Sequence, residues 1–503
     1  MNKDKNNNEV EKLLKTLSSP LKKQISEAAI ILAAGHGKRI KSQRSKMLHK
    51  IWEVPTVERV YDACAKGLKN AVNVIVVGIK AADVMQVIGK RENTVFAYQK
   101  EQNGTGHAVQ VALKTLGNIS ANGTVYVFPG DMGLLDSETV RVFRKKFVKS
   151  GCDMMVLVGV FEGKPEENYY GRIIRVKDKD INGNPSGNEK GNVIGIIEFK
   201  DIIALPEKSD YRITYKGKVY SYSKDELISL REYNSGVYAF RFNPLKKLIR
   251  LLKSNNVQNE IYITDMIYLF NQHGYSVKAV SPEKQYVVMG FNNKSVLKEM
   301  ESIKRKQIYN KLKDIIEIED PDDFFIHEEV VEQLFRMDKK NIPLDITIGK
   351  GVYIGKGARL NYNLELKKNV FIHGNVHFGK NVTVYHNVHL STFPHQVFKI
   401  GDDVTILWGD IIKGNIRIGK GTRIESSVNM TGSDEYPIRI GENVLIKGTS
   451  YLFGSIVESG VVIEHSVLKM KRIRKKVAKD DTVMSVRYFI PNAEGTDLIE
   501  VLK

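Results

Sequence analysis

The segment best suited to chemistry is a short apolar run that ends in a glycine loop and is followed by basic residues. The run covers residues 28–34, Gly35 and Gly37 follow it, and Arg39 and Lys46 come shortly afterwards. The run predicts a buried strand, and a glycine loop at its end lets backbone N–H groups approach an anion closely. The two cations would add charge there. We interpret the segment as a triphosphate cradle at the carboxyl edge of an open α/β sheet.

The spacing of the two glycines excludes two better-known phosphate loops. No third glycine follows at the spacing of a dinucleotide-binding loop, and the P-loop pattern does not fit either. An ordinary strand-to-helix turn could carry the same glycines. The loop therefore defines a function only together with the segments that follow it.

Length and composition bound the class of protein. A chain of 503 residues exceeds one ordinary domain, so two or three are expected. We find no apolar run of about 18 residues and no signal-peptide core near the start, which predicts no membrane partner. The two cysteines, Cys64 and Cys152, cannot form a disulfide framework and suit a reducing cytoplasm. We expect a cytoplasmic protein.

The formal net charge of +19 raises the question of nucleic-acid binding. Lysines are spread along the whole chain, however, and the densest cluster, residues 469–476, has no interleaved aromatic residues for base stacking. We interpret the charge as a solvated basic surface that favours anionic small substrates, rather than as a nucleic-acid site.

Short apolar runs alternate with helical stretches from residue 28 to about 290. Expected strands include residues 30–32, 74–77, 95–98, 125–128 and 154–160, and expected helices include residues 56–67, 81–88, 107–116 and 137–149. This alternation predicts an α/β, Rossmann-like domain with a mostly parallel sheet. The preceding residues 9–27 carry apolar side chains on one helical face, and Pro20 is placed to start a second helix.

A six-residue repeat begins after residue 342. Apolar anchors recur at every sixth position, several of them followed by glycine, and this period is typical of a parallel β-helix. Residues 391–399 and 429–439 break the count and are expected to be loops. The predicted division is a helical extension (1–27), an α/β domain (28–293), a helical linker (294–341), a β-helix (342–470) and a C-terminal tail (471–503).

Nine short motifs follow one another in the α/β domain, at residues 32–39, 46–49, 99–108, 130–131, 170–173, 197–200, 234–236, 262–265 and 290–293. In these motifs the chain resembles the bacterial N-acetylglucosamine-1-phosphate uridyltransferases, whose bifunctional members also acetylate glucosamine-1-phosphate. The segment from Gln99 to Ala108 is the most discriminating for this family. The resemblance implies that residues 28–293 form a nucleotidyltransferase domain and that the β-helix is left-handed.

The resemblance implies attack by a sugar-phosphate oxygen on the α-phosphorus of UTP, giving UDP-N-acetylglucosamine, a cell-envelope precursor, and pyrophosphate. The nucleophile is already anionic, so the enzyme must mainly hold two polyanions in line and offset their repulsion. Mg²⁺ suits this task, and the resemblance makes Asp131 and Asn292 its ligands. The alternatives are a helix N-cap for Asp131 and a turn residue for Asn292.

Further roles follow from the same resemblance. Arg39 and Lys46 would be catalytic and would stabilise the β- and γ-phosphates and the leaving pyrophosphate. Glu198 and Asn234 would contact the sugar, although Glu198 could equally be a strand-edge carboxylate paired with Lys200. The expected substrate-binding residues are Leu32, Ala33, Ala34, Gly35, Gln99, Gly104, Thr105, Gly130, Gly171, Glu198, Asn234 and Asn292.

The chain departs from the family pattern in several places. Ser45 and Pro129 replace a proline and an aromatic residue, and the segment from 201 to 233 is longer, which puts the identity of the sugar in doubt. The β-helix lacks the Gly-His-Leu-Thr-Tyr run of the acetylating members, so we expect it to form a homotrimer instead. Two alternatives remain: acetyl transfer with His395 as base, or a non-catalytic nucleotide-sugar-binding scaffold.

Overall fold

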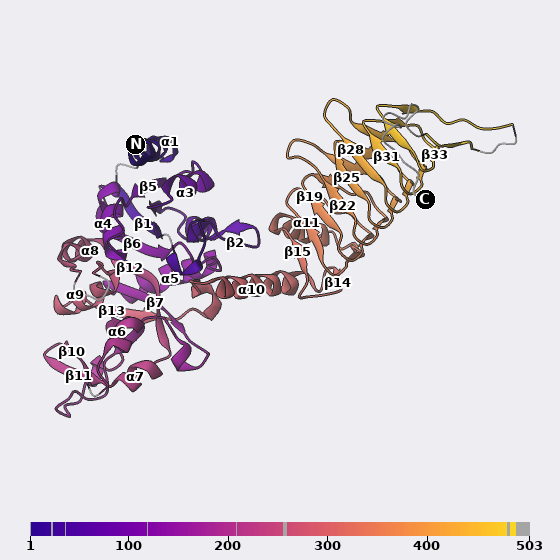
Figure 1. Cartoon of the computed structure of the whole chain (residues 1–503). Coiled ribbons are helices and arrows are strands. Elements are labelled where there is room, and N and C mark those ends of the chain that lie inside the picture. Colours follow the sequence, from indigo (N-terminus) through magenta and orange to yellow (C-terminus); the bar gives the residue numbers. More distant parts are fainter. Residues whose placement is uncertain are drawn as a thin grey trace, which may run out of the picture. The chain divides into compact units, whose positions relative to one another are not determined.

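The structure is a computed structural model that describes residues 2–21, 24–35, 37–117, 119–207, 209–254, 259–479 and 483–488. The chain forms two compact units, Met1–Glu301 and Ser302–Lys503 (Figure 1). No helix in the described ranges is long and apolar enough to cross a membrane.

A nine-stranded mixed sheet forms the centre of the N-terminal unit. Its strands are β1 (Ile25–Ala33), β4 (Val72–Val77), β5 (Thr94–Tyr98), β6 (Ile119–Pro129), β7 (Met154–Val160), β8 (Arg172–Arg175), β9 (Val193–Ile197), β12 (Glu232–Arg241) and β13 (Val277–Val280). The main order is β13-β7-β12-β6-β1-β4-β5, with β8 joined to β12 and β9 joined to β8. Strand β1 is parallel to β4 and β6, whereas β12 is antiparallel to β6 and β7. The predicted Rossmann-like α/β class is confirmed.

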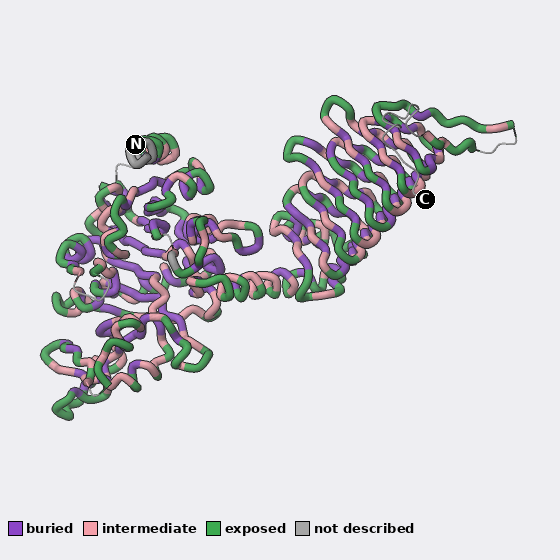
Figure 2. The backbone as a smooth tube through the Cα atoms, viewed as in Figure 1, coloured by how far each residue is buried: buried purple, intermediate pink, exposed green. Residues whose placement is uncertain are grey.

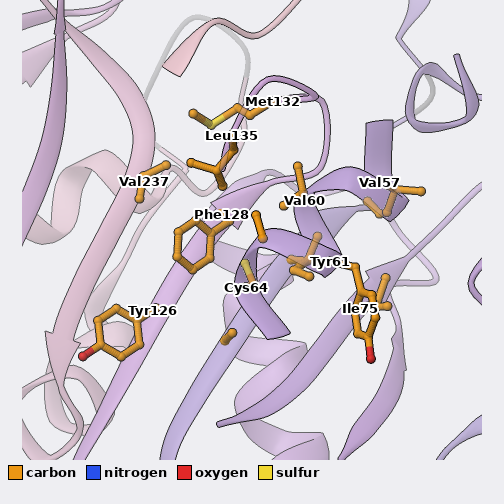
Figure 3. Close-up of a cluster of buried hydrophobic side chains, with 14 of the residues drawn as sticks. Val57, Val60, Tyr61, Cys64, Ile75, Tyr126, Phe128, Met132, Leu135 and Val237 are labelled. Carbon is orange, nitrogen blue, oxygen red and sulfur yellow. The ribbon is translucent and has the colours of Figure 1, made fainter. Parts of the chain in front are cut away.

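Helices pack on both faces of this sheet (Figure 1). They are α1 (Asn2–Leu17), α2 (Thr56–Gly67), α3 (Ala81–Ile88), α4 (Thr105–Leu116), α5 (Ser137–Ser150), α8 (Phe242–Leu248) and α9 (Met266–Gln272). Because side chains alternate along a strand, Ala29 and Ile31 of β1 enter one apolar core cluster and Ala28 and Ile30 enter the other. Figure 3 shows the first cluster, where Val60 and Cys64 of α2 lie with Phe128 of β6.

The prediction that Pro20 starts a second helix is wrong. Helix α1 ends at Leu17, and strand β1 already begins at Ile25. The physical reason is that β1 lies in the middle of the sheet, where pairing with β4 and β6 outweighs the local helical pattern of residues 21–25. The apolar side chains Leu13, Leu14 and Leu17 of α1 pack against the first core cluster.

The longer segment after residue 201 forms a small subdomain of its own. Strands β10 (Tyr211–Tyr215) and β11 (Lys218–Tyr222) form an antiparallel hairpin. The hairpin packs with α6 (Phe199–Ala204) and α7 (Lys224–Ser229) around a separate apolar cluster that includes Ile202, Tyr220 and Leu227.

The C-terminal unit consists of three stacks of short parallel strands (Figure 1). The first stack holds β14 (Glu317–Ile318), β16 (Ile346–Ile348), β18 (Leu364–Leu366), β21 (Val382–Val384), β24 (Thr405–Ile406), β27 (Arg423–Ile424), β30 (Leu445–Ile446), β33 (Val462–Ile463) and β36 (Ser485–Val486). The second holds β15 (Phe324–Ile326), β17 (Val352–Ile354), β19 (Phe371–His373), β22 (His389–Ser391), β25 (Ile411–Gly414), β28 (Asn429–Gly432), β31 (Tyr451–Phe453) and β34 (Val467–Lys469). The third holds β20 (Val376–His377), β23 (Phe398–Ile400), β26 (Ile416–Ile418), β29 (Ile438–Ile440), β32 (Ile456–Val457) and β35 (Arg472–Ile473).

This arrangement is a parallel β-helix and is consistent with the left-handed form that the resemblance implies. Buried and exposed residues alternate along each coil (Figure 2). The anchors of the six-residue repeat, such as Ile348, Leu366 and Val384, are buried and pair with one another from coil to coil. The repeat therefore marks the residues that fill the interior.

The stacked sheets begin before the regular repeat. Helix α10 (Lys294–Leu312) is followed by β14 and β15, which pair with β16 and β17, and α11 (Glu328–Asp338) comes between these two pairs of strands in the sequence. Two strands therefore lie in the range 294–341 that the sequence suggests as a linker. Strands β14 and β15 are only two and three residues long, and α11 separates them from the next coil. They therefore show no six-residue period in the sequence.

Asp410 is a fully buried carboxyl group inside the β-helix. In the two adjacent coils, Val388 and Val428 occupy the positions that correspond to Asp410. One carboxyl oxygen accepts the N–H of Val428 at 2.7 Å, whereas the other has no hydrogen-bond partner among the described residues. Burial raises the pKa of Asp410 to about 8, so the folded protein holds this group as the neutral acid at neutral pH.

This burial predicts a pH-dependent stability. The pKa of Asp410 is about 8 in the folded state against an ordinary value of 3.8, so unfolding releases the proton between these limits. The contribution of Asp410 to the free energy of unfolding should therefore fall as the pH rises from about 4 to about 8. Asp410→Val should remove this slope and raise the melting temperature, as thermal unfolding across that pH range would show. Equal pH slopes for the variant and the parent protein would contradict this account.

Candidate active site

A cavity of about 410 Å³ opens at the carboxyl ends of β1 and β6, the edge where open α/β sheets bind ligands. Walls come from the end of β1, the segment before α4, the loop after β6, and strand β12. Nine residues predicted from the sequence line it: Leu32, Ala34, Gly35, Gln99, Gly104, Thr105, Asp131, Glu198 and Asn234. The structure therefore brings together residues that lie up to 200 positions apart in the chain.

Lys46 joins the two predicted metal ligands. Its ammonium group forms an ion pair with the carboxylate of Asp131 and donates a hydrogen bond of 2.8 Å to Oδ1 of Asn292. The same ammonium lies 5.4 Å from the ring centroid of Phe291. The side chains of Lys46 and Asp131 are 12% and 14% exposed. Because water is largely excluded, the attraction between these charges is stronger than at a surface.

Backbone conformation fixes the position of this cluster. Gly37 has a φ of +75°, and a Cβ on it would lie 2.7 Å from Cβ of Lys46. Gly290 lies against Asp131, because a Cβ on it would come within 3.1 Å of the carboxylate. Ser45, which stands where the family has proline, keeps a φ of −54°, within the range that proline would impose. The substitution therefore leaves the approach to Lys46 unchanged.

Asp131 has no capping role. The N-cap of α5 is Asp136, whose carboxylate accepts the N–H of Thr139 at 2.7 Å. The alternative interpretation of Asp131 as a helix cap is therefore wrong, and its carboxylate interacts with Lys46 instead.

Gln99 is buried beside the start of α4. Its Nε2 donates to the carbonyl of Gly104 at 3.1 Å and lies 3.2 Å from Nδ1 of His107. Gly104 has a φ of +99°, and a Cβ there would lie 2.5 Å from the carbonyl oxygen of Ile261. Only glycine fits this turn. The turn places the Gly104 carbonyl where it accepts the hydrogen bond from Gln99, and this bond orients the Gln99 amide.

Glu198 and Asn234 lie at the other end of the cavity. A Cβ on Gly171 would come within 3.1 Å of both carboxylate oxygens of Glu198, and the Gly171 carbonyl accepts the N–H of Asn234 at 2.8 Å. Oδ1 of Asn234 accepts from the N–H of Gly236 at 2.9 Å and from the hydroxyl of Tyr238 at 2.8 Å. These bonds fix the amide so that its NH₂ group is the remaining donor.

The carboxyl groups near this end titrate close to neutrality. Burial, together with the negative charges of Asp201 and Asp265, raises the pKa of Glu198 to about 7. Burial and Asp201 raise the pKa of Asp265 to about 6. Lys200 is not among the groups that set the pKa of Glu198, which speaks against the alternative of a simple surface ion pair. When ionised, Glu198 is suited to accept hydrogen bonds from hydroxyl groups.

Some predicted residues lie outside the cavity lining. Arg39 belongs to η1 (Lys38–Ile40) and is exposed, so the structure does not place it with Lys46. Ala33 and Gly130 lie beneath the cavity floor, where the N–H of Gly130 donates to the Leu32 carbonyl at 3.0 Å. Asn292 joins the site through Lys46.

Other lining residues were not predicted from the sequence. Tyr262 and Thr264 lie in a motif to which the sequence assigns no role. Outside the lining, the carbonyl of Gly290 accepts a hydrogen bond of 3.1 Å from the Tyr170 hydroxyl. The remaining unpredicted residues include Met47, Gln102, Tyr238 and Glu260. Met47 and Gln102, like Tyr262 and Thr264, lie in motifs that the sequence marks without giving these residues a role, whereas Tyr238 and Glu260 lie outside the motifs.

The donor groups of Asp131 and Asn292 fit a hard cation that keeps most of its coordination to water and phosphate. Their two oxygens converge on a single positive atom, Nζ of Lys46. In the described part of the chain, no three His, Cys, Asp or Glu side chains gather to hold a metal by themselves. This pattern suits Mg²⁺, which typically takes one or two protein oxygens beside substrate phosphates.

The two loops that interrupt the β-helix repeat contact each other. Nε2 of His395 lies 2.7 Å from Oδ2 of Asp434, and Nε2 of Gln396 donates to the other oxygen of Asp434 at 3.0 Å. Both His395 and Asp434 are exposed. Loops are therefore present between β22 and β23 and between β28 and β29, and a histidine–aspartate pair joins them. They are shorter than the predicted ranges 391–399 and 429–439, because residues 398–399, 429–432 and 438–439 pair with neighbouring coils as strands.

Comparison with known proteins shows the class to which the N-terminal unit belongs. Residues 29–176 match the family described as MobA-like NTP transferase domain. The chain is 34% identical over 303 residues to the bifunctional protein GlmU of Thermoanaerobacter pseudethanolicus, covering 60% of this chain and 57% of the relative. It is 33% identical over 343 residues to that of Carboxydothermus hydrogenoformans, covering 68% and 66%. It is 30% identical over 386 residues to that of Caldanaerobacter subterraneus, covering 76% and 73%.

The fold and the site thus define the N-terminal unit as a nucleotidyltransferase domain. The chain belongs to the family of the bifunctional GlmU proteins. The resemblance inferred from the motifs is confirmed. The match to the first two of these relatives spans only 57% and 66% of their length.

The glycine loop yields a test with matched variants. Gly35→Ala meets nothing within 4 Å, so it should keep the melting temperature but lower nucleotide affinity, because the new methyl group enters the cavity. Gly37→Ala should lower both the melting temperature and the nucleotide affinity, because alanine would have to adopt the positive φ of this position and would displace Lys46. Gly89→Ala, with a φ of +67° and no close neighbour, is the control and should lower the melting temperature alone. Normal nucleotide binding by Gly37→Ala in calorimetry would contradict this role of the loop.

Proposed function

We propose that the chain transfers UMP from UTP to N-acetylglucosamine-1-phosphate in a Mg²⁺-dependent reaction that releases pyrophosphate. The observation that carries the proposal is the cluster of Lys46, Asp131 and Asn292 in a nucleotidyltransferase domain, in which Asp131 also lines the cavity. A phosphate oxygen of the sugar phosphate attacks the α-phosphorus, and the bond to the pyrophosphate oxygen breaks. No proton transfer is required, since the nucleophile is already an anion.

Lys46 has two roles in this proposal. Without substrate, its ammonium neutralises Asp131 and binds Asn292. With substrate present, Lys46 would be free to contact the phosphates, and the carboxylate and amide oxygens of Asp131 and Asn292 would hold Mg²⁺. The metal would supply charge neutralisation at the phosphates. We propose that exposed Arg39 contributes further positive charge toward the pyrophosphate.

The two ends of the cavity would bind the two substrates. The uracil would lie beside Gln99, whose amide is fixed by Gly104, and the sugar would lie between Glu198 and Asn234. The amide NH₂ of Asn234 is suited to an acceptor on the sugar, such as an acyl oxygen, and the carboxylate of Glu198 is suited to hydroxyl donors. These complementary groups support the assignment of an N-acetylated sugar.

The β-helix has a second candidate function. Exposed His395 with its partner Asp434 is an arrangement in which a histidine can act as a general base, which favours acetyl transfer to glucosamine-1-phosphate. Consumption of acetyl-coenzyme A that is lost in His395→Ala would support this activity. Its absence in a protein with normal UMP transfer would remove it.

We also propose a homotrimer formed through the β-helix, in a cytoplasmic protein. The outward side chains of Phe325, Tyr353 and Phe371 stack at centroid distances of 4.7 and 4.5 Å, an apolar row suited to contact between copies. Free, buried Cys64 and Cys152 suit a reducing compartment.

The Lys46 cluster gives the principal test of activity. Charge-assisted hydrogen bonds contribute roughly 1.5–3 kcal/mol, so Lys46→Met should lower kcat/KM about 10–150-fold in a pyrophosphate-release assay. Asp131→Ala should abolish turnover. Lys145→Met, which removes an exposed lysine of α5, should act like the parent protein. The double variant Lys46→Met/Asp131→Asn leaves no unpaired charge in the cluster. Its circular dichroism spectrum shows whether the domain folds without this ion pair. Full activity of Lys46→Met, or no pyrophosphate with any sugar-1-phosphate, would contradict the proposal.

Glu198 gives a test of the sugar end. Its pKa of about 7 means that its ionised fraction rises between pH 6 and pH 8. The KM for the sugar phosphate should therefore fall by roughly threefold to tenfold over this range, since an ionised carboxylate accepts hydroxyl hydrogen bonds more strongly. Glu198→Gln retains the titration of the substrate phosphate and serves as the control, with a flatter profile. Identical profiles for Glu198→Gln and the parent protein would rule out this role.

A further inference from the structure

One face of the β-helix carries a row of basic side chains, which we name the basic row. It consists of Arg359, His377, Lys399, Arg417, Arg439 and, beyond Ile456, Arg472. Each member pairs in parallel register with the next along the third stack of strands, except that Ile456 lies between Arg439 and Arg472. Their neighbours within the strands, such as Ile416 and Ile418, are buried, whereas Lys399, Arg417 and Arg472 are exposed. The row therefore points outward.

This stacking is unfavourable for the isolated protein. Lys399, Arg417 and Arg439 lie directly opposite one another. Adjacent strands in a sheet lie about 4.8 Å apart, and like charges in this position destabilise a sheet. Burial and the charges of Arg359 and Lys399 lower the pKa of His377, so this member of the row is uncharged at neutral pH. None of the six strands of this stack contains Asp or Glu. Three carboxylates at the following corner are engaged elsewhere: Asp403 pairs with Lys420, Asp402 accepts the N–H of Lys380, and Glu458 accepts the N–H of Lys475. Burial and the charge of Arg417 lower the pKa of Arg439, as expected for an uncompensated row.

Exposed apolar side chains accompany the charges. Ile456, within the row, is 39% exposed. At the end of the row lies the densest basic cluster of the sequence, residues 469–476, where Met470 is 55% exposed. Val477 and Val483, which pair as an antiparallel bridge, are 45% and 36% exposed. Cations mixed with exposed aliphatic groups are the composition of a surface that lies in a lipid headgroup layer.

We propose that this face of the β-helix binds the surface of an anionic lipid membrane. The contact is peripheral and needs no membrane-spanning helix, and it revises the expectation from the sequence that the chain has no membrane partner. A nucleic acid fits the face less well, because the outward side chains of the third stack include no Phe, Tyr or Trp for base stacking. An acidic protein segment would match the charges but would leave Ile456 and Met470 without apolar contact. The lipid surface accounts for both observations.

The test is co-sedimentation of the full chain with phosphatidylcholine vesicles, with and without phosphatidylglycerol, at low and high salt. The parent protein should bind only the anionic vesicles and should be released by salt. Lys399→Thr/Arg417→Thr should weaken binding roughly tenfold to thirtyfold, as expected for the loss of two cations at a membrane. The same variant should not lower the melting temperature, because it relieves repulsion.

Matched variants distinguish vesicle binding through this face from a general effect of the protein's net charge. Lys413→Thr/Arg423→Thr removes two cations from the other two stacks and should leave vesicle binding nearly unchanged. Ile456→Thr should weaken vesicle binding severalfold without changing the charge. Equal loss in the control variant, or no binding to anionic vesicles, would overturn the proposal. So would preferential binding to a single-stranded oligonucleotide or to polyglutamate that competes with the vesicles.

Discussion

The ammonium group of Lys46 is the interaction on which the site depends. It binds the carboxylate of Asp131 and the amide oxygen of Asn292 in a setting that is largely closed to water. A carboxylate in such a place would be costly without a cation beside it. The same arrangement explains how the site can exchange one cation for another, because both oxygens already converge on a point of positive charge. Substrate and metal would take over a position that the protein itself has preformed.

The fold supplies the geometry for this exchange. Strands β1 and β6 are parallel neighbours, so the glycine loop after β1 and Asp131 after β6 meet at one edge of the sheet. Lys46 follows a few residues later and is held by Gly37, while the segment from Gly290 to Asn292 closes the cluster from the far end of the domain. Three stretches of chain that are far apart in sequence thereby contribute to one cluster of charged and polar groups. The end of the cavity that we propose for the sugar includes Asn234 of β12.

The sequence predicts the fold well because its periodicities are regular. The alternation of apolar runs and helices marks the central sheet, and the six-residue repeat marks the interior of the β-helix. Motif order identifies Lys46, Asp131 and Gln99, whose roles depend on residue type. The pattern could not place Arg39, which lies on an exposed loop, nor could it exclude a helix at Pro20, because the position of β1 within the sheet depends on distant strands. The basic row is equally invisible in the linear sequence, since its members are 18 to 33 residues apart and align only when the coils stack.

A crystal structure with UTP and Mn²⁺ in place of Mg²⁺ tests the central claim most directly, because anomalous scattering locates the metal independently of the protein. The account predicts a metal peak bonded to the carboxylate of Asp131 and the amide oxygen of Asn292, with the Lys46 ammonium shifted onto the phosphates. A metal bound elsewhere, with the bond between Lys46 and Asp131 intact beside the nucleotide, would contradict it.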